Sequence, residues 1–295
     1  MFRDAKYSLL MMAAAFIWGS AFVAQKMGMD DIGPCTFAFM RSVIGCIAML
    51  PVILTIRKAG TVRQLATRPA RRDLAIGALV CGTFLVIPVL FQQIGMKYTT
   101  AGKAAFITAQ YILIVPLLGL LVGKRTSWLL WLGVACAVFG MYLLCIKPGE
   151  TICKGDLWEC ACAFTFAFHI MAIDRFAKRI DNILLNFAQF VVCAALAAIP
   201  MLLFEEPRWN GIMKCAMPLL YVGVLSSGVA YTLQVVTQKH LKPAVAAIVM
   251  STESVFGALC GWAVLGERLS AREFMGCVLV FAATLLAQVR GKGGD

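Results

Sequence analysis

The feature that most constrains this chain is a recurrence of long apolar runs. About ten stretches of roughly 18–24 mostly uncharged residues follow one another from Tyr7 to Arg290, with short charged links between them. A helix needs about 20 apolar residues to cross the ~30 Å hydrocarbon core of a bilayer. Only helices satisfy the backbone polar groups of such runs within lipid. The sequence therefore predicts an all-α integral membrane protein without room for a soluble domain.

The predicted membrane spans are ten helices. They cover residues 7–27, 34–56, 73–95, 101–122, 127–146, 156–176, 183–204, 215–237, 243–265 and 271–290. The composition agrees with this prediction, because 61% of the residues are hydrophobic and 14% are charged. An ordinary soluble domain carries about 25% charged residues. The first run is too long for a cleaved signal peptide and lacks a small-residue cleavage site.

Positive charge is divided unevenly between the two sets of links. If both termini lie inside, seventeen Lys and Arg residues fall on the inner side and nine on the outer side, while Arg41 lies within a span. Cytoplasmic loops of membrane proteins carry the excess of Lys and Arg. We therefore expect both termini in the cytoplasm. This sidedness explains the net charge of +12 better than a nucleic-acid partner does.

The two halves of the chain resemble each other. When residues 101–143 are moved forward by 143 positions they fall on 244–286, and the two segments share a G-x-R-x-S-x5-G core. Each repeat would hold five helices, and this odd number places the second copy in the membrane upside down. Inverted repeats recur in secondary transporters. We expect a first five-helix repeat over residues 1–146, a second, inverted one over 150–290, and a short cytoplasmic tail over 291–295.

Several motifs carry a resemblance to a known family. They are Trp18-Gly19-Ser20, Pro34 with Phe39-Met40-Arg41, the opening Gly102-Lys103-Ala104-Ala105 of the fourth span, and, most strongly, the run from Ser251 to Gly276. They resemble the EamA-type ten-helix members of the drug/metabolite transporter superfamily over nearly the whole chain. The resemblance implies two EamA-like repeats and export or exchange of small metabolites such as amino acids, without ATP hydrolysis, in a bacterial inner (plasma) membrane. Many relatives have proline after the residue that matches Glu253, whereas Ser254 stands here, so the resemblance brings no proline-made helix break.

Glu253 is the leading candidate for a functional residue, because it lies near the middle of the ninth span. A charged side chain at the bilayer centre costs about 2.5–3.5 kcal/mol on insertion scales. Glu253 would carry a proton or bind a cationic group, or it would be a structural carboxyl that locks helices. Gln110 is its repeat mate, so inverted symmetry should bring spans four and nine together. Arg41 either faces a cavity, where it pairs with Glu253 or a substrate carboxylate, or its long stem reaches the outer surface.

Two further spans carry polar and aromatic residues on one helical face. Span six presents Glu159, Cys162, Phe166 and His169. Span eight presents Ser227, Tyr231, Gln234 and Gln238. These residues would line a polar interior or bond neighbouring helices. Histidine is the side chain whose charge changes most readily near neutral pH, so His169 joins Glu253 as a candidate for proton coupling. The predicted substrate-binding or cavity set is Trp18, Phe22, Arg41, Gln92, Gln110, Phe166, His169, Tyr231, Gln234 and Glu253.

Missing motifs narrow the function further. The sequence has no G-x-x-x-x-G-K-[ST] loop for ATP and no HExxH or GxSxG motif. Its two histidines and the absence of a CxxC pair predict no metal site, and we expect no cofactor. The sequence thus predicts a secondary active transporter, an exporter or exchanger of small polar or amphipathic metabolites, with protons as a candidate coupling ion, rather than an enzyme. The alternative is a membrane enzyme acting on a lipid-linked substrate, with Glu253 and His169 as acid and base. The oligomeric state stays open.

Overall fold

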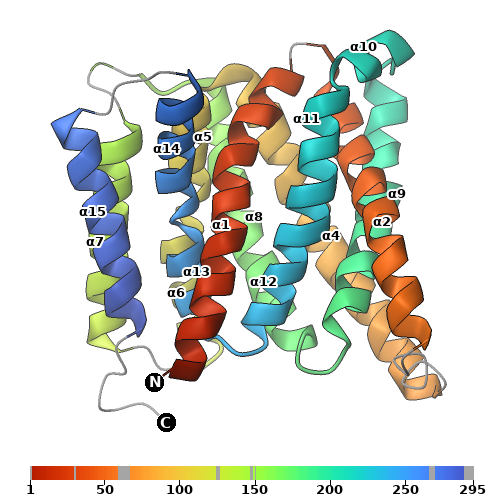
Figure 1. Ribbon diagram of the computed structural model, residues 1–295, viewed down its shortest axis with the longest axis horizontal. Helices are drawn as coiled ribbons and strands as arrows, with labels where there is room; N and C mark the ends of the chain where they lie inside the picture. The colour runs from red at the N-terminus through yellow and green to blue at the C-terminus, as the bar shows by residue number, and fades with distance from the viewer. Residues whose placement is uncertain are drawn as a thin grey trace.

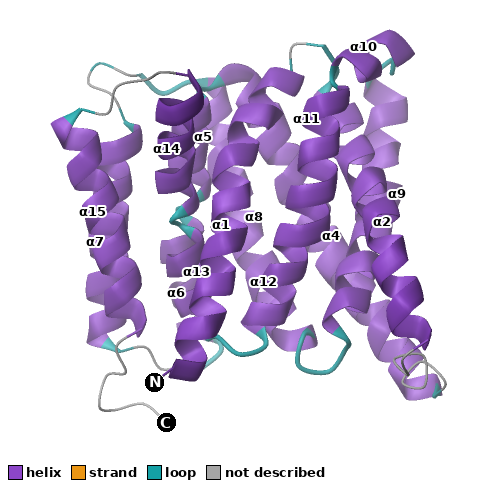
Figure 2. Cartoon of the chain, viewed as in Figure 1, coloured by secondary structure: helices purple, strands orange, loops and turns teal. Residues whose placement is uncertain are grey.

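The computed structural model describes residues 2–29, 31–58, 67–123, 127–146, 149, 151–265 and 270–288. Within these ranges the chain is helical and contains no strand (Figure 2). Nine helices of the described part are long and apolar enough to cross a membrane. Three residues of the repeated G-x-R-x-S core, Arg125, Gly266 and Arg268, lie outside the described ranges, as does the tail over 291–295.

Each half of the chain crosses the bundle five times. The first half forms α1 (Phe2–Gly28), α2 (Pro34–Lys58), α4 (Arg68–Tyr98), the pair α5 (Ala101–Thr108) and α6 (Tyr111–Leu121), and α7 (Trp128–Cys145). The second half forms α8 (Lys154–Phe176), α9 (Asn182–Phe204), the short α10 (Trp209–Lys214), the run of α11 (Ala216–Leu220), η1 (Tyr221–Ala230) and α12 (Tyr231–Gln238), the pair α13 (Pro243–Met250) and α14 (Glu253–Leu265), and α15 (Ala271–Gln288). The predicted all-α fold of ten spans in two inverted five-helix repeats is confirmed.

The packing partners follow the symmetry of an inverted repeat. α4 of the first half packs against α8 and α9, and its counterpart in the second half, the run from α11 to α12, packs against α1 and α2. The counterparts α2 and α9 pack on each other at one edge of the bundle, and α7 and α15 do so at the other edge (Figure 1). α1 begins and α15 ends at the same end of the bundle, here called the terminus face, and the opposite end is the α10 face (Figure 1).

Spans four and nine are broken, although the sequence analysis predicted continuous helices there. α5 ends at Thr108 before α6 begins at Tyr111, and α13 ends at Met250 before α14 begins at Glu253. The two breaks are related by the 143-residue offset of the repeat, since that offset places Gln110 on Glu253. The two helices therefore break within one residue of the same position of their repeat, near the middle of the bundle (Figure 2).

The break before α14 forms without proline. Its hydroxyl groups donate to backbone carbonyls: Ser251 Oγ to Ile248 at 2.7 Å, Thr252 Oγ1 to Val249 at 2.7 Å and Ser254 Oγ to Ser251 at 2.8 Å. Side-chain hydroxyls of this kind compete with the backbone hydrogen bonds of a helix. Three such hydrogen bonds fall within four residues at the break, where the Val249 and Ser251 carbonyls also accept backbone hydrogen bonds from the residues three positions later.

Span eight also differs from the uniform helix that the sequence predicted, because its middle is the ten-residue π-helix η1. η1 packs closely on α2 at glycines. A side-chain carbon added to Gly45 of α2 would lie 2.8 Å from Ser227, and one added to Gly223 of η1 would lie 2.5 Å from Ile44. π-helical segments inside longer helices often occur at functional sites. Here the segment carries Ser226 and Ser227, which contact the buried cation described below.

The largest hydrophobic core cluster draws its residues from both halves. Its aromatic members are Trp18 of α1, Tyr111 of α6, Phe166 of α8, Phe190 of α9 and Tyr231 of α12. Two of these helices belong to the first half and three to the second. The core cluster therefore lies between the two repeats.

Candidate functional site

Glu253 lies at the break between α13 and α14, and only 5% of it is exposed. Its Oε1 accepts a hydrogen bond of 3.0 Å from the hydroxyl of Tyr111, which begins α6 at the matching break. Spans four and nine thus meet at this carboxyl. The contact is made by Tyr111 rather than by its neighbour Gln110, which is half-buried and donates to the carbonyl of Phe106 in its own span at 3.0 Å. The sequence analysis named Gln110 as the repeat mate of Glu253, whereas the next residue, Tyr111, makes the hydrogen bond.

α1 approaches this site through Gly19. A side-chain carbon at Gly19 would collide with the Glu253 carbonyl and lie 2.7 Å from the backbone nitrogen of Gly257. The missing side chain brings the backbone of α1 directly against α14. The preceding residue, Trp18, is buried in the core cluster, with an exposed fraction of 8%.

Tyr231 is the centre of the aromatic wall around the site. Its ring centroid lies 5.0 Å from that of Trp18, 5.3 Å from that of Phe190 and 6.0 Å from that of His169. Phe166 belongs to the same core cluster and contacts the His169 ring edge to face at 6.1 Å. Four predicted residues, Trp18, Phe166, His169 and Tyr231, are thus brought together. The Tyr231 hydroxyl is within electrostatic range of both Arg41 and Glu253.

Arg41 is buried, with 2% exposure, so its side chain does not reach the outer surface. Its guanidinium donates to Gln25 Oε1 at 2.9 Å, to Ser226 Oγ at 2.9 Å and to Ser227 Oγ at 3.3 Å. All three acceptors are uncharged, and the ion pairs found among the described residues do not include Arg41. Arg41 is therefore a desolvated cation held between α1, α2 and η1 by neutral groups, and it does not pair with Glu253 in this structure.

His169 belongs to a hydrogen-bond network that the sequence analysis missed. His169 Nε2 lies 3.1 Å from Gln189 Oε1, Gln189 donates to Asn186 at 2.7 Å, and Asn186 donates to Thr232 at 2.8 Å. The network ties α8 to α9 and α12. The missed signal was an Asn and a Gln three residues apart in an apolar run, which places two polar groups on one helix face in lipid.

The remaining predicted residues lie around this centre. Gln234 is fully buried and its Oε1 has no hydrogen-bond partner within the described chain. Gln92 is buried beside Cys162 of α8. Phe22 is also buried, but in a separate apolar cluster with Phe37 and Met96. The enzyme alternative required Glu253 and His169 to work together, whereas the structure bonds them to different partners, Tyr111 and Gln189. Across the described ranges no group of three or more His, Cys, Asp or Glu side chains could hold a metal ion.

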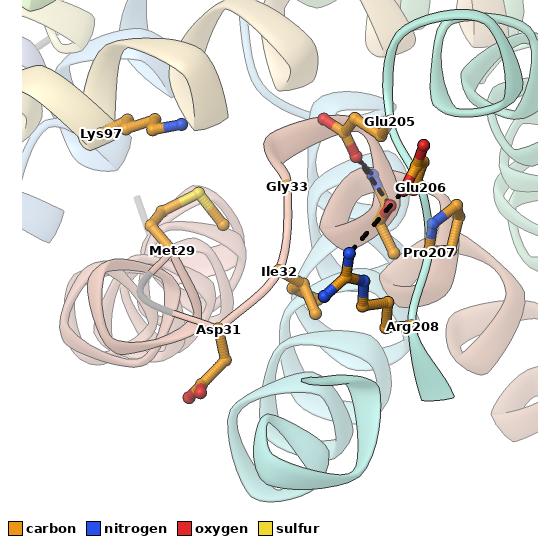
Figure 3. A pocket seen from close by; sticks show the side chains of 10 residues that line it. Met29, Asp31, Ile32, Gly33, Lys97, Glu205, Glu206, Pro207 and Arg208 are labelled. Carbon is orange, nitrogen blue, oxygen red and sulfur yellow. Dashed lines mark hydrogen bonds and ion pairs between the residues drawn. The ribbon is translucent and has the colours of Figure 1, made fainter. Parts of the chain in front are cut away.

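A second feature is an open pocket of about 330 Å³ at the α10 face (Figure 3). It is lined by Met29, Asp31, Ile32, Gly33, Thr36, Lys97, Glu205, Glu206, Pro207 and Arg208. Beside it the Glu205 carboxylate accepts hydrogen bonds from the Cys35 nitrogen at 2.8 Å, the Thr36 nitrogen at 2.7 Å and the Thr36 hydroxyl at 2.6 Å. These nitrogens are free donors at the start of α2, where a negative charge is stabilised. Glu205 therefore links the end of α9 to the start of α2 by hydrogen bonds, and these bonds join the two halves of the chain at this face.

A bundle of ten spans in two inverted halves, with broken helices meeting at a buried polar centre, is the architecture of a membrane transporter. The sequence matches the EamA-like transporter family over residues 5–146 and 153–288, and the chain belongs to this family. The predicted resemblance is thereby confirmed.

Individual relatives agree with the family. An uncharacterized transporter of Archaeoglobus fulgidus is 29% identical over 285 residues, which cover 94% of this chain and 83% of the relative. The uncharacterized transporter YoaV of Bacillus subtilis is 21% identical over 281 residues, with 93% and 94% covered. The crystal structure of another protein shares the fold with a TM-score of 0.76, at 18% identity and 96% coverage of both chains. The protein is thus an integral membrane transporter that acts on a small molecule.

Proposed function

We propose that this protein is a secondary active transporter that exports or exchanges small polar or amphipathic metabolites, with amino acids as the substrate class. Alternating access would come from the movement of the repeat over residues 1–146 against the inverted repeat over 150–290. The observation that carries the proposal is the hydrogen bond between Tyr111 and Glu253, because it joins the two broken helices at the interface of the repeats. Discontinuous helices at corresponding positions are the usual location of a transporter's binding site.

The charges around Tyr231 support a zwitterionic substrate. Arg41 and Glu253 are both buried and both within electrostatic range of the Tyr231 hydroxyl, so a cation and a carboxyl belong to the same buried region. A desolvated cation without a charged partner is costly, and a bound carboxylate would offset that cost through charge-assisted hydrogen bonds. The ammonium group of an amino acid would be attracted by Glu253 and by the faces of Trp18 and Tyr231. These two charges support an amino acid over a purely cationic or purely anionic metabolite.

Protons are the proposed coupling ion, and Glu253 their carrier at the site. An ionised carboxylate with a single hydroxyl donor is expensive at this burial, so protonation would accompany the closed form and release would accompany opening. The proposed orientation places both termini in the cytoplasm of a bacterial cell and the α10 face outside. It is supported by the excess of Lys and Arg on the links of the terminus face.

The test begins with metabolite profiling of cells with and without the protein. Compounds that differ are then offered to proteoliposomes, and accumulation driven by a pH gradient is compared with counterflow. For Glu253→Gln we expect loss of proton-driven accumulation with counterflow retained, because exchange needs no net proton release. The matched control is Glu206→Gln, which removes an exposed carboxyl at the α10 face.

Other results would change the assignment. If Glu253 binds a cationic group of the substrate instead, Glu253→Gln will weaken binding and abolish counterflow as well. If Glu253 is a structural carboxyl, glutamine will preserve both activities, since it keeps the size and the hydrogen-bonding capacity. Wild-type accumulation with an unchanged profile over about pH 5.5 to 8.5 would exclude the coupling role.

A further inference from the structure

Glu159 is a second buried carboxyl, which the sequence analysis grouped with Cys162, Phe166 and His169 on one face of span six. It is fully buried in α8. Its Oε2 accepts a hydrogen bond of 2.7 Å from the Thr108 hydroxyl, and its Oε1 has no partner among the described residues. Gly95 of α4 lies against that same oxygen, since a side-chain carbon at Gly95 would come within 2.5 Å of Oε1. The carboxyl is thus enclosed by α4, α5 and its own helix.

No cation among the described residues forms an ion pair with the Glu159 carboxyl. One turn toward the α10 face, Asp156 forms a buried ion pair of 2.6 Å with Lys103, and Lys103 also donates to the Thr151 carbonyl at 2.6 Å. One turn in the other direction lies the buried thiol of Cys162. An ionised Glu159 would be a buried anion with one hydroxyl donor, whereas a neutral acid leaves only an uncharged oxygen unpaired, which costs far less.

Glu159 and Glu253 are both held by the break in span four. Thr108, which ends α5, donates to Glu159, and Tyr111, which begins α6, donates to Glu253 at 3.0 Å. Thr108 and Tyr111 are three residues apart and stand at the two sides of the break. A movement of α5 against α6 would therefore change the surroundings of both carboxyls at once. Glu159 is the one of the two that lies next to the Asp156–Lys103 pair of the α10 face.

We propose that Glu159 is a second proton-binding site of the transport cycle, at which the coupled proton is loaded between the α10 face and Glu253. This rests on the proposed function. In the closed arrangement Glu159 is a neutral carboxylic acid. When the α10 face opens, the proton leaves as H⁺ to water, and the remaining carboxylate keeps the Thr108 hydrogen bond and gains water as a donor. Reprotonation from that side reverses the step, so protons are conserved without any other reactant.

The first test needs no substrate. Infrared difference spectra of the protein in lipid nanodiscs, recorded over about pH 5 to 9, report the C=O stretch of protonated carboxyls. We expect Glu159→Gln to remove one such band at neutral pH and Glu253→Gln to leave that band in place. Glu206→Gln, the exposed control, should match the wild type. A Glu159→Gln spectrum identical to that of the wild type at every pH would show that Glu159 is ionised and would overturn the proposal.

Variants that keep the carboxyl separate a specific environment from a general loss of folding. Thr108→Val removes the hydroxyl donor at nearly constant volume, so the Glu159 band should shift to higher frequency, and Thr108→Ser should restore it. Gly95→Ala should move the same band by pressing on Oε1. A Thr108→Val spectrum without a shift would contradict the hydrogen bond on which the assignment depends.

Transport then tests the role in coupling. Proteoliposomes receive a mixture of radiolabelled amino acids under a pH gradient of one unit. One coupled proton sustains about a tenfold accumulation per pH unit, so Glu159→Gln should lower the accumulation ratio about tenfold while counterflow continues. Unchanged accumulation would overturn the loading role. If the wild type moves no amino acid at all, the proposed function fails instead, and the spectra still decide whether Glu159 binds a proton.

Discussion

At the scale of single residues, two hydrogen bonds define the buried centre of this transporter. The Tyr111 hydroxyl donates to Glu253, and the Thr108 hydroxyl donates to Glu159. The repeat register identified Gln110 as the mate of Glu253, and the pairing of the two spans followed as expected. The side chain that bonds Glu253 is nevertheless that of Tyr111, the first residue of α6. The repeat register aligns the backbones of the two spans, whereas the direction of each side chain depends on the local helix geometry.

This contact gives a prediction for Tyr111→Phe. The change removes the donor to Glu253 and leaves the ring in the core cluster. We expect a loss of roughly 0.5–1.5 kcal/mol of stability, the usual worth of one hydrogen bond, together with a changed pH profile of transport. Thermal unfolding in detergent and counterflow measured against pH check it. Tyr98→Phe, at a tyrosine that is 53% exposed, is the control and should leave both unchanged. An unaltered pH profile in Tyr111→Phe would show that this hydroxyl does not influence Glu253.

At the scale of elements, the broken helices are the main difference between expectation and structure. The sequence predicted single apolar helices for the fourth and ninth spans. It has Ser254 at the position where many relatives have proline. Three hydroxyl–carbonyl hydrogen bonds stabilise the break in its absence. Short-range hydrogen bonds from Ser and Thr are difficult to weigh from sequence, because the same residues also occur in unbroken helices.

The break predicts opposite outcomes for two proline substitutions. The Ser254 nitrogen makes only a 3.3 Å bond to Ser251, and proline is favourable in the first turn of a helix, so Ser254→Pro should fold with nearly wild-type stability. The Phe256 nitrogen donates to Thr252 at 3.0 Å, so Phe256→Pro should cost about 3 kcal/mol. Thermal unfolding of both variants is the measurement. Equal destabilisation would argue against a helix start at Glu253.

The link between α9 and α2 predicts a change of access at the α10 face. Glu205→Ala removes the acceptor for the Cys35 and Thr36 nitrogens, so α9 and α2 lose these hydrogen bonds beside the pocket. We expect Cys35, now 7% exposed, to react several-fold faster with a membrane-impermeant maleimide, as read by peptide mass spectrometry. Cys193 is fully buried in α9 and serves as the internal control, whose labelling should stay unchanged. Glu205→Gln should give an intermediate rate, because it keeps one acceptor oxygen.

At the scale of the whole molecule, the topology follows from charge and from the number of crossings. α1 begins and α15 ends at one face, the terminus face (Figure 1). Because the links predicted for this side carry the excess of Lys and Arg, we expect this face in the cytoplasm. A fluorescent reporter fused to the C-terminus should therefore be active, and alkaline phosphatase fused there should be inactive. The reverse pattern would show the opposite orientation, in which the α10 pocket faces the inside of the cell.

The sequence by itself determined the membrane class, the ten spans, the two inverted repeats and the depth of Glu253. These properties depend on the local transfer of side chains into lipid and on a register visible in the residues themselves. Only the tertiary structure decided that spans four and nine break, that span eight contains a π-helix and that Arg41 is buried among neutral groups. It also decided that Glu159 rests on Thr108 and Glu205 on the start of α2. The contacts of Arg41, Glu159 and Glu205 depend on partners far away in the chain, whose distance and direction no local pattern encodes. The break before α14 depends on short-range hydrogen bonds of a kind that also occurs in unbroken helices.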